Sequence, residues 1–87
     1  MQNFPNPFNA STNIRFNLAK NTDVELSIYN LLGRKVTTLV SGNMTAGLKS
    51  VTWNGKDNSG NQVASGLYLY VLKTDDGSQS KQMLLLK

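Results

Sequence analysis

The feature that most constrains this chain is a set of short segments in which apolar residues recur at every second position. In residues 12–18, Ile14, Phe16 and Leu18 alternate with polar neighbours, which places the three apolar side chains on one face of an extended strand. No segment shows the period of about 3.6 residues that an amphipathic helix requires. The pattern predicts an all-β domain with six strands, at residues 12–18, 23–28, 34–41, 48–54, 67–74 and 78–87.

Glycine- and asparagine-rich turns separate these segments. Gly33 can adopt the left-handed conformation that a bulged hairpin requires, and residues 75–77 (Asp-Asp-Gly) are a strong hairpin signal. Residues 41–47 are expected to form a loop, and residues 55–61 a tight polar loop. Short strands joined in this way indicate an immunoglobulin-like antiparallel β-sandwich of six to seven strands. Residues 62–64 are the candidate for the seventh.

The core is expected to form around Trp53, Phe16, Ile28 and the strand at residues 67–74. That strand is apolar on both faces, as in a central strand that is covered from both sides. The chain has no cysteine, so packing of these side chains has to supply what a disulfide supplies in antibody domains.

The first eleven residues are rich in proline and asparagine and do not continue the strand pattern. Residues 1–11 contain both prolines, and each proline favours extended geometry in the residue before it. We expect residues 1–11 to be an irregular, extended lead-in with a Pro-Asn-Pro motif, with Phe4 and Phe8 available as anchors. Residues 12–87 then form a single β-sandwich domain.

Size and charge exclude several classes. A chain of 87 residues builds one modest core. The net charge of +4 comes from basic residues that are spread without a dense run, which argues against a nucleic-acid partner. No apolar run approaches the roughly 20 residues that cross a bilayer, so no membrane insertion is expected. No secretory signal is visible at the start, and any such signal is expected on a longer parent chain.

The chain has few residues of the types that carry out catalysis or bind metals. The chain has neither histidine nor cysteine, which removes the usual general base, the thiol nucleophile and the commonest metal ligands. Asp23 and Glu25 share a strand face at a spacing that a glycosidase pair uses, but a solvated outer face explains them better. Asp57, Ser59 and Asn61 superficially resemble a calcium loop, but a plain turn is the better interpretation. We therefore predict no enzyme activity, no cofactor and no metal.

Aromatic residues offer one further alternative. Trp53 and the tyrosines of residues 67–74 could stack on sugar rings if they were exposed. Their alternation with apolar neighbours favours a role in the core instead.

The most apolar run of the chain lies at its C-terminus, in residues 81–87. An apolar end is either buried in the domain's own sheet or held for a partner. We predict that this run forms a terminal strand that completes the domain's own sheet and is also recognised by other proteins.

Four segments together resemble one family. They are residues 3–9 (NFPNPFN), residues 28–36 (IYNLLGRKV), residues 53–66 (WNGKDNSGNQVASG) and residues 66–70 (GLYLY). In this order they resemble the type A C-terminal sorting domains of the type IX secretion system of Bacteroidetes and related bacteria. The segment at residues 53–66 is also similar to the immunoglobulin-like domain of the flagellar hook-capping protein.

The resemblance implies a secretion signal at the C-terminus of a larger cargo chain. In that family the cargo passes through the periplasm, the outer-membrane translocon recognises the folded domain, and a sortase-like peptidase removes it. The implied location is the outer-membrane surface or the medium, and the expected state is a monomer or weak dimer. The family's recognition residues correspond to Pro5, Asn6 and Pro7 in the opening motif, Gly33 as the central glycine, and Leu84, Leu85, Leu86 and Lys87 in the terminal segment.

Two rival interpretations belong to other classes. The first is an accessory domain that binds carbohydrate or packs against a catalytic neighbour. The second is a structural module like the flagellar cap domain, which works by self-association. Exposed aromatic residues in a groove would favour the first, and a stable oligomer would favour the second.

Overall fold

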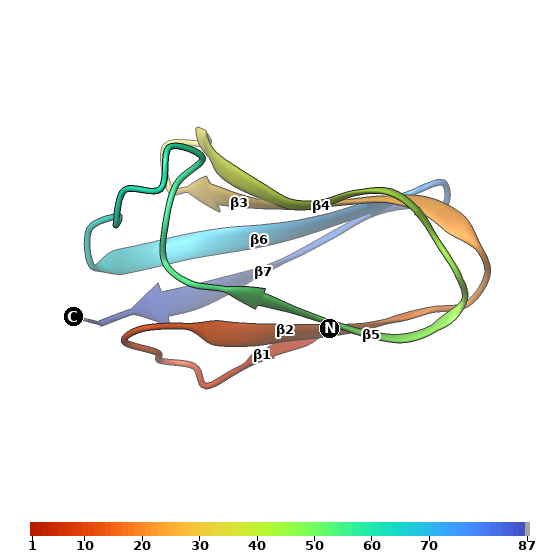
Figure 1. Ribbon diagram of the computed structural model, residues 1–87, viewed down its shortest axis with the longest axis horizontal. Coiled ribbons are helices and arrows are strands. Elements are labelled where there is room, and N and C mark those ends of the chain that lie inside the picture. The colour runs from red at the N-terminus through yellow and green to blue at the C-terminus, as the bar shows by residue number, and fades with distance from the viewer. Residues whose placement is uncertain (87) are drawn as a thin grey trace.

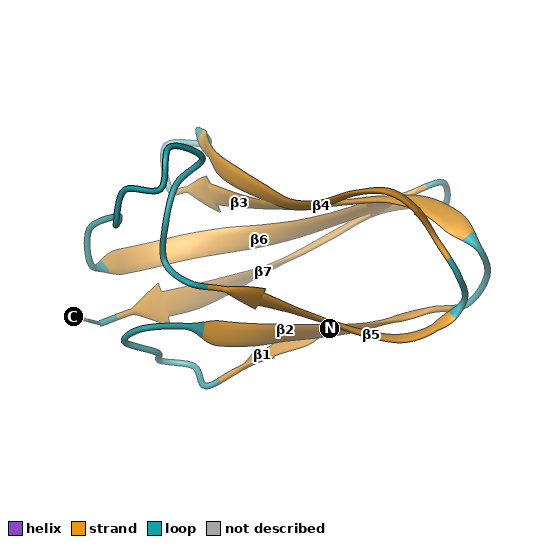
Figure 2. Cartoon of the chain, in the orientation of Figure 1, coloured by secondary structure: helices purple, strands orange, loops and turns teal. Residues whose placement is uncertain are grey.

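The computed structural model describes residues 1–86 and shows an all-β domain. Figure 2 shows only strands and loops, and no helix of the described residues is long and apolar enough to span a membrane. The prediction of an all-β chain is therefore confirmed. The strands are β1 (Gln2–Phe4), β2 (Thr12–Leu18), β3 (Thr22–Asn30), β4 (Lys35–Met44), β5 (Gly47–Trp53), β6 (Gly66–Thr74) and β7 (Gly77–Leu85).

The strands form two antiparallel sheets that pack face to face (Figure 1). One sheet has three strands in the order β1-β2-β5, and the other has four in the order β4-β3-β6-β7. The domain measures 36 × 23 × 19 Å. This arrangement confirms the predicted immunoglobulin-like sandwich, with seven strands.

The core lies between the sheets and consists of the side chains that the period-two pattern placed inward. Trp53 is 1% exposed, and the rings of Phe8 and Tyr68 meet it edge-on at centroid distances of 5.6 and 5.3 Å. The indole Nε1 donates a hydrogen bond to the carbonyl oxygen of Lys56 at 3.0 Å. The predicted core residues Phe16, Ile28 and Tyr70 are also buried.

The connection between β4 and β5, which crosses from the four-stranded to the three-stranded sheet, is shorter than the sequence suggested. Residues 41–47 were expected to form a loop, but β4 continues to Met44 and β5 begins at Gly47. The start of β3 pairs with this extension, since Thr22 lies opposite Met44. Cross-strand hydrogen bonds to β3 hold these polar residues in a strand that their own composition does not favour.

The seventh strand lies elsewhere than predicted. Residues 62–64 form no strand, and only an isolated bridge joins Lys56 to Gln62. The additional strand is β1, inside the lead-in that was expected to be irregular, and it pairs with β2 through Asn3 opposite Ile14. Three residues form a strand here because an already formed edge offers them hydrogen bonds, which a local pattern does not reveal.

One face of β6 differs from the prediction. Tyr68, Tyr70 and Leu72 are buried between the sheets, but the opposite face is not covered. Leu67 is 40% exposed, and Leu69 is only partly buried. The strand is central, since β3 and β7 flank it, but the described residues provide no second layer over its outer face.

We expect Trp53→Phe to lower the free energy of unfolding by about 2–3 kcal/mol, because it removes buried ring area and leaves the Lys56 carbonyl without its donor. Urea unfolding followed by circular dichroism measures this. The control is Leu48→Ala at a side chain that is 84% exposed, which should change stability by less than about 0.5 kcal/mol. Equal effects of the two substitutions would contradict the central role of Trp53.

Candidate functional site

At one end of the sandwich, the loop between β1 and β2 lies beside the end of the C-terminal strand β7 (Figure 1). The Phe8 amide donates to the Leu84 carbonyl at 3.0 Å, and the Leu86 amide donates to the Phe8 carbonyl at 2.7 Å. The Leu84 amide donates to Asn6 Oδ1 at 3.0 Å. We call residues 5–8 the clip, because these three hydrogen bonds hold them against the end of β7.

The clip is anchored from both sides. Phe8 is 2% exposed and packs on Trp53. At the other end, the Pro5 carbonyl accepts hydrogen bonds from Thr12 Oγ1 at 2.8 Å and Asn3 Nδ2 at 3.3 Å. Both prolines follow cis peptide bonds. Of the two predicted anchors, Phe8 is confirmed, whereas Phe4 is 51% exposed and lies beneath the Arg15 guanidinium.

The structure divides the terminal recognition segment into different environments. Leu85 is 1% exposed and belongs to the core, whereas Leu86 is 48% exposed. Leu84 is partly buried on the outer side of the sheet. Lys87 lies outside the described residues. Among the three described residues of this segment, Leu86 therefore has the side chain that a partner reaches most readily.

Gly33 does not join this site. It lies in the hairpin between β3 and β4, and β6 separates β3 from β7 in the sheet. Its φ of +81° confirms the left-handed conformation. Asn30 Oδ1 accepts hydrogen bonds from the amides of Leu32 and Arg34, both at 3.0 Å. Gly33 thus shapes a rigid hairpin on the far side of the sheet from the clip.

A partly exposed apolar strip on the outer face of the four-stranded sheet was not identified as a site from the sequence. We define the outer strip by side chains that share this face, as the strand register shows: Tyr29, Leu67, Leu69, Val71 and Leu84. The apolar character of both faces of β6 was the available signal. That signal favours a covered strand, because sequence alone does not show whether a second layer exists.

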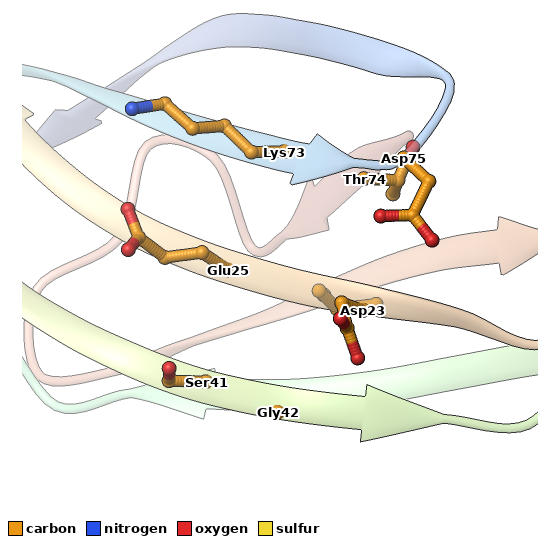
Figure 3. A pocket seen from close by; sticks show the side chains of 8 residues that line it. Asp23, Glu25, Ser41, Gly42, Lys73, Thr74 and Asp75 are labelled. Carbon is orange, nitrogen blue, oxygen red and sulfur yellow. The ribbon is translucent and has the colours of Figure 1, made fainter.

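Acidic side chains line a shallow groove on the same outer face, between β3, β4 and the end of β6 (Figure 3). Glu25 Oε2 accepts hydrogen bonds from Lys35 Nζ at 3.3 Å and Ser27 Oγ at 3.2 Å. These hydrogen bonds, first that of Lys35, hold the pKa of Glu25 below its ordinary value of 4.5. Asp23 Oδ1 accepts a hydrogen bond from Asn43 Nδ2. A general acid needs a raised pKa, so this geometry favours the interpretation as a solvated pair.

The other two candidate sites also have structural explanations. Asp57 Oδ1 accepts hydrogen bonds from the amides of Ser59 at 2.9 Å and Asn61 at 3.0 Å, which confirms the interpretation as a turn. Trp53 and Tyr70 are each 1% exposed, so the predicted core role of the aromatic residues is confirmed. Among residues 1–86, no group of three or more acidic side chains is placed to hold a metal ion.

The fold and the clip define the class of this protein as an immunoglobulin-like β-sandwich domain with no disulfide. The chain belongs to the FlgD Ig-like domain family, which matches residues 6–78. A search of curated protein sequences finds no match to this chain. The family match agrees with the resemblance of residues 53–66 to the flagellar hook-capping protein.

Two solved structures show the same fold. The crystal structure of dimeric latent PorU from Porphyromonas gingivalis superposes with a TM-score of 0.75 at 23% identity, over 98% of this chain and 9% of PorU. The crystal structure of FlgD from P. aeruginosa superposes with a TM-score of 0.66 at 29% identity, over 86% of this chain and 59% of FlgD. This chain thus corresponds to a small part of PorU and to somewhat more than half of FlgD.

We expect Lys35→Gln to raise the pKa of Glu25 toward its ordinary value, because Lys35 is the main cause of the lowered pKa. The folded-state pKa lies below the unfolded one, so the pair stabilises the fold above about pH 4.5 and loses its effect as the pH falls further. NMR titration of the Glu25 carboxyl carbon measures this. Lys73→Gln, which removes a weaker interaction, should raise the pKa less; an equal or larger rise would contradict the assignment.

We expect Asn6→Ala to accelerate hydrogen exchange of the Leu84 amide and to lower stability by about 1 kcal/mol, because that amide loses its acceptor. The matched control is Asn9→Ala at an exposed asparagine in the same loop, which should leave exchange at Leu84 unchanged. Unaltered exchange in Asn6→Ala would show that the clip does not protect the C-terminal strand.

Proposed function

We propose that this domain is a C-terminal secretion signal that the outer-membrane type IX translocon recognises. It directs a larger cargo chain through the periplasm to the cell surface or the medium, and a sortase-like peptidase then removes it. The observation that carries the proposal is the clip, in which the Pro-Asn-Pro motif holds the terminal segment. These are the two motifs at opposite ends of the chain that the resemblance to type A sorting domains assigns to recognition.

The clip gives this proposal a physical basis. A terminal strand usually frays, but here Leu85 is buried and the amides of Leu84 and Leu86 are both hydrogen-bonded to the clip. The segment is therefore presented in one conformation, with the Leu86 side chain partly exposed. Because its two halves come from opposite ends of the chain, the recognition surface exists only in the folded domain. A translocon that recognises this surface thereby distinguishes the folded from the unfolded sorting domain.

In this function the domain is a substrate. Its family consists of Ig-like domains, which are typically non-catalytic. The carboxylates at Asp23 and Asp57 are engaged in local hydrogen bonds with Asn43 and with a turn. The carbohydrate-binding alternative loses its main support, because the tryptophan and the two tyrosines of β6 are buried in the core.

The test is a fluorescent reporter fused to this domain, with a signal peptide, in a bacterium that has the type IX system and in a strain without its translocon. We expect Leu86→Asp to reduce surface or medium reporter by about tenfold or more, because a charge replaces an exposed apolar contact. Removing Leu84 to Lys87 altogether should abolish export, but this also deletes the core residue Leu85.

Leu48→Asp is the matched control, since Leu48 is an exposed leucine on the other sheet, and its export should equal that of the unmodified domain. Thermal unfolding of each purified domain establishes that both variants fold. Normal export of Leu86→Asp would contradict recognition through the terminal segment. Periplasmic retention of the unmodified fusion in both strains would contradict the function itself.

A further inference from the structure

The outer edge of β7 continues beyond the clip with unused backbone groups. The amide and carbonyl of Leu84 both point to the clip, away from β6. Backbone groups of alternate residues point to the same side of a strand, and the register of β7 against β6 runs from Leu85 back to Gly77 without a shift. The amides and carbonyls of Ser78, Ser80 and Gln82 therefore face outward along the same edge.

This stretch is an open edge in the part of the chain that the structure describes. β7 is the last strand of its sheet, and no other described strand pairs with Ser78, Ser80 or Gln82 on the outer side. The edge already accepts extended chain in one place, because Phe8 and Leu85 form a parallel bridge. A row of unpaired backbone groups beside such a bridge is a template on which another extended segment can pair.

The side chains around this edge indicate which types of side chain the pairing segment has. On the outer face, Ser80 lies opposite Val71 and Gln82 opposite Leu69, so the edge borders the outer strip, where both of these apolar side chains are only partly buried. On the inner face, Lys81 is exposed and has no ion pair among the described residues. Cross-strand pairs stabilise a sheet when apolar groups meet and opposite charges meet.

We propose that an extended segment of the translocon adds to β7 as a fifth strand along Ser78 to Gln82, beside the clip. Its side chains alternate between apolar residues that extend over the outer strip and an acidic residue that meets Lys81. This inference rests on the proposed function and adds the surface and the chemistry of the partner. The proposed strand-addition site ends at Gln82, because the clip already pairs with the backbone of Leu84.

A second copy of this chain fits the edge less well. Antiparallel pairing of two β7 strands about Ser80 would place Lys81 opposite Gln79 of the other copy and serine opposite serine. Such a pair would leave the outer strip uncovered and Lys81 without a carboxylate. Lysine on an edge strand commonly prevents self-pairing.

The test is Ser80→Pro in the reporter fusion. Proline removes the outward amide and places its ring at the edge, while the bonds between β7 and β6 are made by the neighbouring residues, so the domain should fold. We expect export to fall by about tenfold. Ser80→Ala, which keeps the amide, should be exported normally, and Lys81→Glu should reduce export through charge repulsion. Thermal unfolding of the purified variants checks the fold, and Gln82→Pro serves in the same way if Ser80→Pro does not fold.

The outcomes separate this inference from the function. Normal export of a folded proline variant, with export still lost in Leu86→Asp, overturns the added strand and leaves the sorting function intact. Failure of the unmodified fusion to be exported overturns both.

Cross-linking is a second test. Since the chain has no cysteine, Ser80→Cys provides a single thiol in the domain for cross-linking. A cross-link to a translocon subunit supports the inference, and a dimer of this chain as the main product overturns it.

Discussion

The packing of aromatic rings around Trp53 is the interaction on which the rest of the structure depends. Trp53 ends β5 in the three-stranded sheet, Tyr68 lies in the four-stranded sheet, and Phe8 comes from the loop before β2. One indole thus joins both sheets and the start of the chain. In a domain of this size, with no disulfide or metal group in the described residues, such burial of large rings supplies a major part of the stabilisation.

The same cluster connects the core to the recognition surface. Phe8 is both a core residue and the residue whose backbone pairs with Leu84 and Leu86. Holding its ring against Trp53 therefore holds the clip on the C-terminal strand. Exposed features extend from this anchored end: Leu86 follows β7, the open edge runs along β7, and the outer strip lies mainly on β6. A proposed partner can meet a preformed surface, which lowers the entropy cost of binding.

Local patterns in the sequence were sufficient for most of the elements. Alternation in residues 12–18 predicted β2 with its observed bounds, and the Asp-Asp-Gly segment predicted the hairpin before β7. The positive φ of Gly33 followed from turn chemistry. Within the predicted site, the sequence identified Pro5 to Pro7 and the terminal leucines as separate motifs. It did not show that they touch, or that Leu85 is buried and Leu86 exposed, because burial depends on the packing of distant segments.

What the sequence by itself determined is the class of the fold, the inward faces of the strands and the absence of cysteine and histidine chemistry, because these follow from short-range periodicity and residue types. Only the tertiary structure decided that residues 2–4 become a strand, that β4 extends to Met44, and that β6 has an uncovered outer face. Each of these depends on hydrogen bonds or a covering layer contributed by residues far away in the chain. The contact between residues 5–8 and the end of β7 is decided in the same way, since a backbone edge accepts a partner by geometry and carries little sequence signal of its own.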